Sequence, residues 1–264
     1  MKLKTEFETI IFGIRDTIAE IRLNRPYRLN AVVEQLYSDV IAGIDLAESN
    51  AEVRVIVITG EGRAFCVGAD LKTHGKGERS PLEKREYLLL GNEVCRRIYM
   101  SSKPVIAAVN GYALGAGAEI SVSSDFILMK ESAQLGFPEV SIGTFVGGGI
   151  TQILPRLVGL AKARELIISG RRINGREAVA IGLATRSFDD DGFETGVEDF
   201  ARSIAAKAPF SLRFAKQHLN DAGRSYEATL VTELEALRAC MVTQDWKEGI
   251  AAFAEKRKPV FKGH

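Results

Sequence analysis

Hydrophobic residues are distributed differently in the two parts of the chain. Up to about residue 147, short apolar runs alternate with amphipathic stretches, which predicts strands at 10–14, 19–23, 53–59, 105–109 and 125–129 and an extended piece at 134–137. The β-branched run Val53–Thr59 is typical of a buried strand. Asn30 is the expected N-cap of a helix that reaches Ser49, and Ser80-Pro81-Leu82-Glu83 is a capping box that begins a helix ending near Met100.

From about Gly148 onward the pattern is almost wholly helical. Apolar residues recur at helical spacing through 150–169, 176–182, 195–207, 210–220 and 226–254. Gly170, Gly182 and Pro209 separate these helices. We therefore expect an α/β, strand-rich core followed by a helical C-terminal part.

Composition narrows the class of protein. The 264 residues are 46% hydrophobic and 26% charged, as in an ordinary soluble globular protein. A net charge of +1 gives no general attraction to nucleic acid or to an acidic membrane. There is no N-terminal apolar run, no stretch of ~18 apolar residues and no paired motif among Cys66, Cys95 and Cys240, so we expect a cytoplasmic protein with reduced thiols.

Several signatures of chemistry are absent from the sequence. His74, His218 and His264 are far apart and no HExxH or Cys/His cluster occurs, so no metal site is expected. The P-loop GxxxxGK[ST] and the nucleophile elbow GxSxG are also missing. A GxGxxG fingerprint would need glycine at Ile120, which disfavours a dinucleotide-dependent oxidoreductase.

The most informative segment is 103–119, in which an apolar strand leads through a turn of tiny residues into a helix. Small residues at Ala116 and Gly117 let a ligand approach backbone N–H groups at the helix start, where developing negative charge on oxygen is stabilised. Glu119 follows in a small, apolar setting, which would raise its pKa toward the range useful for proton transfer. The alternative interpretation is an exposed acid that favours a helix N-terminus.

Glu139, which follows Phe137 and Pro138, is a second candidate acid. Alone it would be a turn residue. Paired with Glu119 it suggests addition of water across a double bond, because that reaction needs one group to take a proton and another to deliver one.

Two weaker candidates lie elsewhere in the chain. The strand-to-loop corner at 63–72 could expose the N–H of Ala69, although a simple corner is the alternative. The tail at 253–262 combines basic residues with aromatics, which suits phosphates and an adenine ring, although charge runs at chain ends are usually only solvated.

Taken in their order along the chain, the sequence motifs resemble those of the enoyl-CoA hydratase/isomerase (crotonase) family. The resemblance covers essentially the whole chain and rests on Asn24-Arg25-Pro26, Leu29-Asn30-Ala31, Phe65-Cys66-Val67-Gly68-Ala69-Asp70-Leu71, Lys103-Pro104, Asn110-Gly111-Tyr112-Ala113, Glu119, Phe137-Pro138-Glu139, Gly143-Thr144 and Glu255-Lys256-Arg257-Lys258-Pro259. It implies a spiral core of repeated ββα units over 1–195 and a helical trimerisation region over 196–264. It also implies a homo-oligomer, either a trimer or a dimer of trimers.

The resemblance implies roles for individual residues. Ala69 and Ala116 match the positions whose backbone N–H groups form an oxyanion hole for a thioester carbonyl oxygen. Glu119 matches the acid that activates water for attack at C3, and Glu139 matches the acid that delivers a proton to C2. The CoA-binding positions are matched by Arg28, Ala69, Asp70, Leu71, Lys72, Phe253 and Lys256, the last two reaching CoA from a neighbouring subunit. No metal or other cofactor is implied, since coenzyme A enters as part of the substrate.

Possession of both carboxylates points to an enoyl-CoA hydratase, which reversibly hydrates a 2-enoyl-CoA to a 3-hydroxyacyl-CoA. Two positions depart from the family pattern. Ala116 stands where glycine is more common, which is harmless provided that its φ stays negative. Val146 stands where proline is usual, which leaves the acyl group open.

Three alternatives remain within this resemblance. One is a Δ3,Δ2-enoyl-CoA isomerase that uses Glu139 alone, and another is a different acyl-CoA-transforming member. The third is a non-catalytic RNA-binding member, which the near-neutral charge and the retained acid pair disfavour. The expected partners are therefore an acyl-CoA substrate and further copies of the chain, without nucleic acid or membrane.

Overall fold

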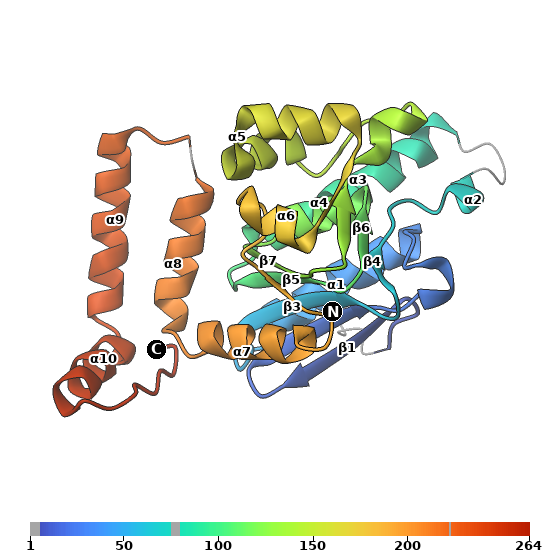
Figure 1. The fold of residues 1–264 in the computed structure, drawn as a ribbon. Coiled ribbons are helices and arrows are strands. Elements are labelled where there is room, and N and C mark those ends of the chain that lie inside the picture. The colour runs from blue at the N-terminus through green and yellow to red at the C-terminus, as the bar shows by residue number, and fades with distance from the viewer. Residues whose placement is uncertain (1–5, 75–79, 222) are drawn as a thin grey trace.

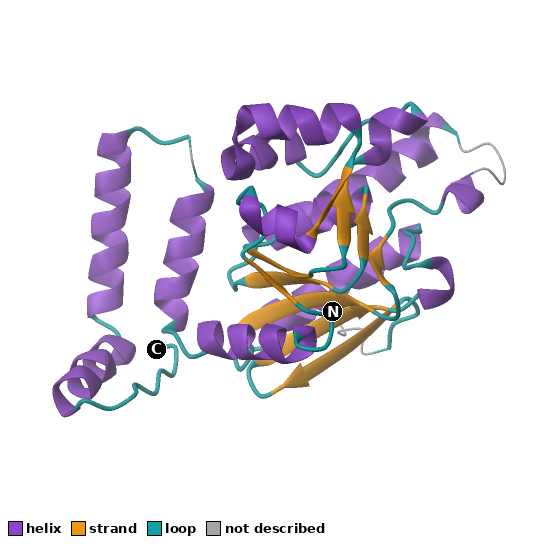
Figure 2. Ribbon diagram, viewed as in Figure 1, coloured by secondary structure: helices purple, strands orange, loops and turns teal. Residues whose placement is uncertain are grey.

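A computed structural model describes residues 6–74, 80–221 and 223–264. Its centre is a six-stranded sheet with the order β1-β2-β3-β5-β7-β10 (Figure 2). The strands of this sheet are β1 (Ile10–Arg15), β2 (Ile18–Leu23), β3 (Val55–Gly60), β5 (Val105–Val109), β7 (Phe126–Lys130) and β10 (Arg186–Phe188). β1 pairs antiparallel with β2, and every other neighbouring pair is parallel.

A second, smaller sheet has the order β4-β6-β8-β9. It is made of β4 (Ala64–Cys66), β6 (Tyr112–Leu114), β8 (Gln134–Gly136) and β9 (Arg172–Asn174). The chain alternates between the sheets, from β3 to β4, from β5 to β6 and from β7 to β8, and a helical segment follows each pair. This arrangement confirms the predicted spiral of ββα units.

Helices cover the two faces of the large sheet unequally (Figure 1). Ile56 and Ile58 of β3 face a core shared with α1 (Glu34–Ser49), α3 (Pro81–Met100) and α4 (Ala116–Val122). Val55 and Val57 alternate to the other face, where α7 (Phe193–Ala205) packs. Period-2 alternation in a strand covered on both sides accounts for the continuous apolar run in the sequence.

The remaining helical segments are η1 (Pro26–Arg28), α2 (Leu71–His74), η2 (Pro138–Ile142), α5 (Ile150–Ser169), α6 (Gly175–Ala180), α8 (Pro209–Asn220), α9 (Tyr226–Met241) and α10 (Gln244–Glu255). In Figure 1, α9 and α10 stand apart from the sheets, and α9 has no buried residue. Lys216 joins α8 to the core, because its ammonium group donates to Asp125 Oδ2 over 2.7 Å and to two backbone carbonyls. No helix in the described part of the chain is both long and apolar enough to cross a membrane.

The last residues fold back onto α10 and the sheet. Asp245, which is buried, accepts hydrogen bonds from the amides of Lys262 and Gly263 over 2.6 and 2.8 Å. Arg54, which directly precedes β3, donates to the carbonyl oxygens of Phe261 and Ala205. The tail is therefore held at both α10 and the core.

Three local predictions need correction. The continuous helix expected over 226–254 is two helices, α9 and α10, because Thr243 caps a new start by accepting from the Trp246 amide. β9 and β10 are short strands in a region that was expected to be helical. Asn30 does not cap α1, whose N-cap residue is Val33.

The Asn30 side chain instead forms hydrogen bonds with the backbone of three other residues. Its side chain accepts from the Arg25 amide and donates to the carbonyl oxygens of Glu61 and Ala64, with its own φ at +56°. We expect Asn30→Ala to lower the free energy of unfolding by about 3 kcal/mol, because buried polar groups lose their partners and alanine disfavours positive φ.

Urea unfolding measures this loss. Asn50→Ala is the matched control, because Asn50 Oδ1 accepts a single exposed bond from the Glu52 amide, and its cost should stay below about 1 kcal/mol. Equal costs for the two substitutions would contradict the structural role of Asn30.

Candidate active site

Two glycines bring the end of β4 against the start of α4. A Cβ atom on Gly117 would lie 2.1 Å from the Cys66 carbonyl oxygen, so only glycine permits this contact. Gly68 has φ of +86°, and a Cβ atom there would lie 3.5 Å from the Ala116 nitrogen. The 68–69 and 115–116 segments are therefore direct neighbours.

The amides of Ala69 and Ala116 lie on these neighbouring segments. Val32 forms a parallel bridge with Ala69, in which it bonds to the Gly68 oxygen and to the Asp70 amide, so the Ala69 N–H points away from Val32. Ala116 opens α4, where a helix leaves its first N–H groups without intrahelical partners. The φ of Ala116 is not positive, so alanine is tolerated at this position, where glycine is more common in the family. The positive φ of +55° belongs to Gly115 instead.

A buried ion pair supports the Ala69 segment. The Arg25 guanidinium donates to Asp70 Oδ2 over 3.3 Å and to the Ala31 carbonyl oxygen, and both charged side chains are almost fully buried. The Asn-Arg-Pro motif thus fixes the segment that carries Ala69. Asp70, predicted to contact CoA, is buried in this pair.

Glu119 lies in the first turns of α4 and is partly buried. Its Oε1 accepts a hydrogen bond from the Gly147 amide over 2.6 Å. Burial raises the pKa of Glu119, and the Gly147 N–H opposes that shift by stabilising the charged form.

Glu139 lies in η2 and is 7% exposed. A Cβ atom on Gly115 would lie 3.2 Å from its Oε1, which places this carboxyl group at the start of α4. Its Oε2 is buried without a hydrogen-bond partner among the described residues. Burial raises the pKa of Glu139 to about 7, and the nearby charge of Glu119 adds to the shift.

The structure thus brings Glu119, Glu139 and Ala116 together around the first turns of α4, with Ala69 alongside. The other predicted CoA contacts are dispersed. Arg28, Leu71 and Lys72 are exposed on η1 and α2, whereas Phe253 and Lys256 are exposed at the end of α10. Figure 1 places α10 and α2 at opposite ends of the molecule.

Sequence reasoning missed two residues at this site. Gly147 supplies the hydrogen bond to Glu119, and Asn92 of α3 accepts one from the neighbouring Gly148 amide over 3.1 Å. The run of three glycines at 147–149 was the available signal for a close backbone approach. Among residues 6–74, 80–221 and 223–264, no group of three His, Cys, Asp or Glu side chains could hold a metal ion.

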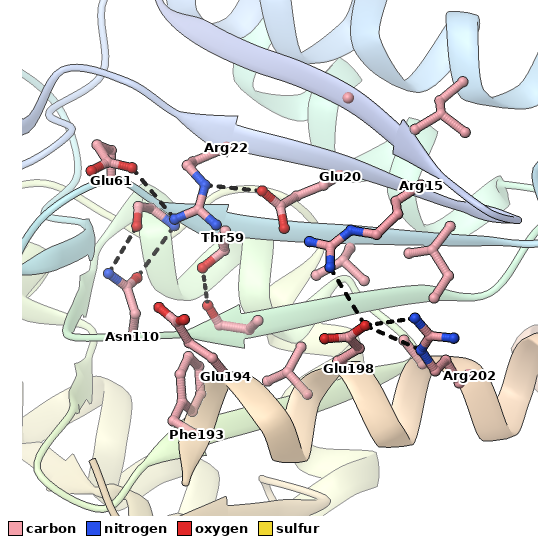
Figure 3. Close-up of a pocket in the computed structure, with 18 of the residues that line it drawn as sticks. Arg15, Glu20, Arg22, Thr59, Glu61, Asn110, Phe193, Glu194, Glu198 and Arg202 are labelled. Atoms are coloured by element: carbon pink, nitrogen blue, oxygen red, sulfur yellow. Dashed lines mark hydrogen bonds and ion pairs between the residues drawn. The ribbon is translucent and has the colours of Figure 1, made fainter. Parts of the chain in front are cut away.

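A cavity of about 760 Å³ lies elsewhere, between α7 and the opposite face of the large sheet (Figure 3). Several of its charges pair with one another, since Arg22 contacts Glu20 and Glu61, and Glu198 contacts Arg15 and Arg202. No predicted site residue lines this cavity. This cavity is therefore not a candidate active site, and its residues serve as controls in the experiments below.

Comparison with known proteins places this geometry in a family. The sequence pattern described as "Enoyl-CoA hydratase/isomerase" matches residues 13–264. The chain belongs to this family. It is 36% identical to the short-chain-enoyl-CoA hydratase of Clostridium acetobutylicum over 96% of this chain and 97% of that protein. It is also 34% identical to the 2,3-dehydroadipyl-CoA hydratase of Escherichia coli over 96% and 98% of the two chains.

Solved structures of family members share the fold. The enoyl-CoA hydratase of Bacillus anthracis superposes with a TM-score of 0.93 at 33% identity, covering 97% of this chain and 100% of that one. The likeness spans both the two-sheet core and the C-terminal helices. The crotonase architecture inferred from the motifs is thereby confirmed.

The raised pKa of Glu139 predicts a specific dependence of stability on pH. Between pH 4.5 and 7 the folded protein holds a proton that the unfolded chain releases, so the free energy of unfolding falls as pH rises through this range. We expect Glu139→Gln to raise the free energy of unfolding by about 2 kcal/mol at pH 8 and to change it little at pH 4.5. Urea titrations at both pH values measure this difference, and an equal effect at both would contradict the assignment.

Proposed function

We propose that the protein is an enoyl-CoA hydratase that adds water reversibly to a 2-enoyl-CoA without a further cofactor. The observation that carries the proposal is the meeting of two partly or fully buried carboxyl groups, Glu119 and Glu139, beside the amides of Ala69 and Ala116. Acids that are drawn from different elements and share one low-dielectric site suit coupled proton transfers.

The surroundings of the two acids support different roles for them in this proposal. Glu119 accepts a short N–H bond, which favours its ionised form, so it takes the proton from the attacking water. Glu139 is more deeply buried and its pKa lies near 7, so it holds the proton that is delivered to C2. Because each charge affects the other, the acids titrate as a pair.

The amides of Ala69 and Ala116 bind the thioester oxygen as negative charge develops on it. Loss of one such donor typically costs about 2.7–4 kcal/mol of transition-state stabilisation. One acid–base group contributes about 10²–10⁴-fold to the rate. The oxyanion pair and the acid pair are therefore effects of comparable size.

The acyl group is short or polar in the named relatives. The relatives from Clostridium acetobutylicum, Syntrophomonas wolfei and Escherichia coli are a short-chain-enoyl-CoA, a crotonyl-CoA and a 2,3-dehydroadipyl-CoA hydratase respectively. We take crotonyl-CoA as the first substrate to test, within a panel that includes a dicarboxylic acyl group.

Assembly into a trimer completes the CoA site in this proposal. α9 has no buried residue and exposes Leu230, Val231, Leu234, Leu237 and Met241, an apolar surface that a second copy would cover. Phe253 and Lys256 would then reach the CoA bound by Arg28 and Lys72 of the neighbouring copy. The three cysteines are free, which suits a reducing cytoplasm.

Loss of enoyl-thioester absorbance tests the hydratase assignment. We expect Glu119→Gln and Glu139→Gln each to lower kcat on crotonyl-CoA by about 10²–10⁴-fold. Glu198→Gln, in the paired charges beside α7, is the control and should leave kcat unchanged. Retained turnover in Glu119→Gln together with shift of a 3-enoyl double bond would instead identify an isomerase that uses Glu139 alone.

Replacing Leu234 and Leu237 with glutamate tests the assembly. We expect the mass in solution to fall from three chains to one chain of 28.8 kDa, and KM for crotonyl-CoA to rise about tenfold because the neighbour's contacts are lost. Glu235→Gln, on the same helix, is the control and should stay trimeric. A wild-type protein that sediments as a monomer with full activity would refute this part of the proposal.

A further inference from the structure

Two side chains from different helices hold adjacent amides of one loop. The segment Val146–Gly149, here called the glycine loop, lies between η2 and α5 and directly precedes α5. Its Gly147 N–H donates to Glu119 Oε1 of α4 over 2.6 Å, and its Gly148 N–H donates to Asn92 Oδ1 of α3 over 3.1 Å. A Cβ atom on Gly147 would lie 3.5 Å from both Asn92 Oδ1 and Glu119 Oε2, so the two side chains flank the loop together.

The loop needs such fixing because its own backbone is permissive. Gly148 and Gly149 have φ of +62° and +78°, and glycine loses more conformational freedom on ordering than any other residue. A Cβ atom on Gly148 would lie 2.6 Å from Cys95 Sγ, so the loop is seated against α3 at a spacing that only glycine permits. Val146 at one end and Ile150 at the other are buried and anchor the flanks.

We propose that Asn92 is a positioning residue, which fixes Gly148 and thereby keeps the Gly147 N–H on Glu119. This inference rests on the proposed function, in which ionised Glu119 takes a proton from water. Asn92 acts through the loop and is not assigned contact with the substrate.

Among the described residues, the Gly147 N–H is the hydrogen-bond donor to the Glu119 carboxyl group. Glu119 is faced by Glu139 from η2, Tyr37 from α1, Cys66 from β4 and Cys95 from α3. Burial raises the pKa of each of these groups, so the tyrosine and the thiols carry no positive charge that could offset the charge of Glu119 near pH 7. A loosened glycine loop therefore raises the pKa of Glu119.

Asn92→Leu tests the inference, because leucine has a similar shape and accepts no hydrogen bond. We expect amide hydrogen exchange at Gly147 and Gly148 to accelerate at least tenfold and the acidic limb of the kcat profile to move up by about one pH unit. kcat on crotonyl-CoA should fall by up to about tenfold below the wild-type acidic limb and recover toward the wild-type value as pH rises, with KM changed less than threefold.

Two further variants separate positioning from general damage. Asn92→Asp keeps an acceptor for the Gly148 N–H and should restore slow amide exchange. Arg96→Gln, an exposed position one turn along α3, should change neither the exchange nor the pH profile.

The outcomes are distinguishable. Unchanged exchange in Asn92→Leu, or faster exchange with an unmoved acidic limb, would overturn the positioning role. If the wild-type protein hydrates no 2-enoyl-CoA, the proposed function fails. The exchange rates and the Glu119 pKa, read by carbon NMR of labelled glutamate, then still decide whether Asn92 controls this carboxyl group.

Discussion

The site depends on the close backbone contact between the end of β4 and the start of α4. Gly117 lies directly against the Cys66 carbonyl oxygen, and Gly68 lies against Gly115 and Ala116. Side chains at these positions would force the segments apart by ångströms, and the amides of Ala69 and Ala116 would no longer be neighbours. The spiral fold supplies this contact by passing the chain from one sheet to the other immediately before each helical segment.

Glu119 and Glu139 have chemically identical side chains, but their hydrogen bonds in the buried site differ. Glu119 keeps a backbone N–H on one oxygen, whereas one oxygen of Glu139 has no donor among the described residues. The same removal from water raises both pKa values, and the Gly147 N–H opposes that rise at Glu119 by stabilising the charged form, so the two carboxyl groups are hydrogen-bonded unequally. The hydratase proposal requires this inequality, because one acid must accept while the other donates.

The sequence predicted the parts that depend on local pattern. The strands of the large sheet up to β7, the capping box at Ser80 and the meeting of Glu119 with Glu139 all followed from periodicity or from ordered motifs. Contacts between distant backbone segments were not predictable in this way. Asn30 has the side chain of a helix cap, yet its partners at Glu61 and Ala64 lie over thirty residues away. β9 and β10, at three residues each, are too short to give a periodic signal and exist only through their sheet partners.

The folded-back tail has a consequence for the order of events during synthesis. Arg54 directly precedes the central strand β3, and its bond to the Phe261 carbonyl spans 207 positions. The ribosome releases the N-terminal part first, so the two sheets can assemble while α10 still lacks the partners that orient it. α9 and α10 are therefore the last helices to gain a fixed direction, after the two sheets have formed.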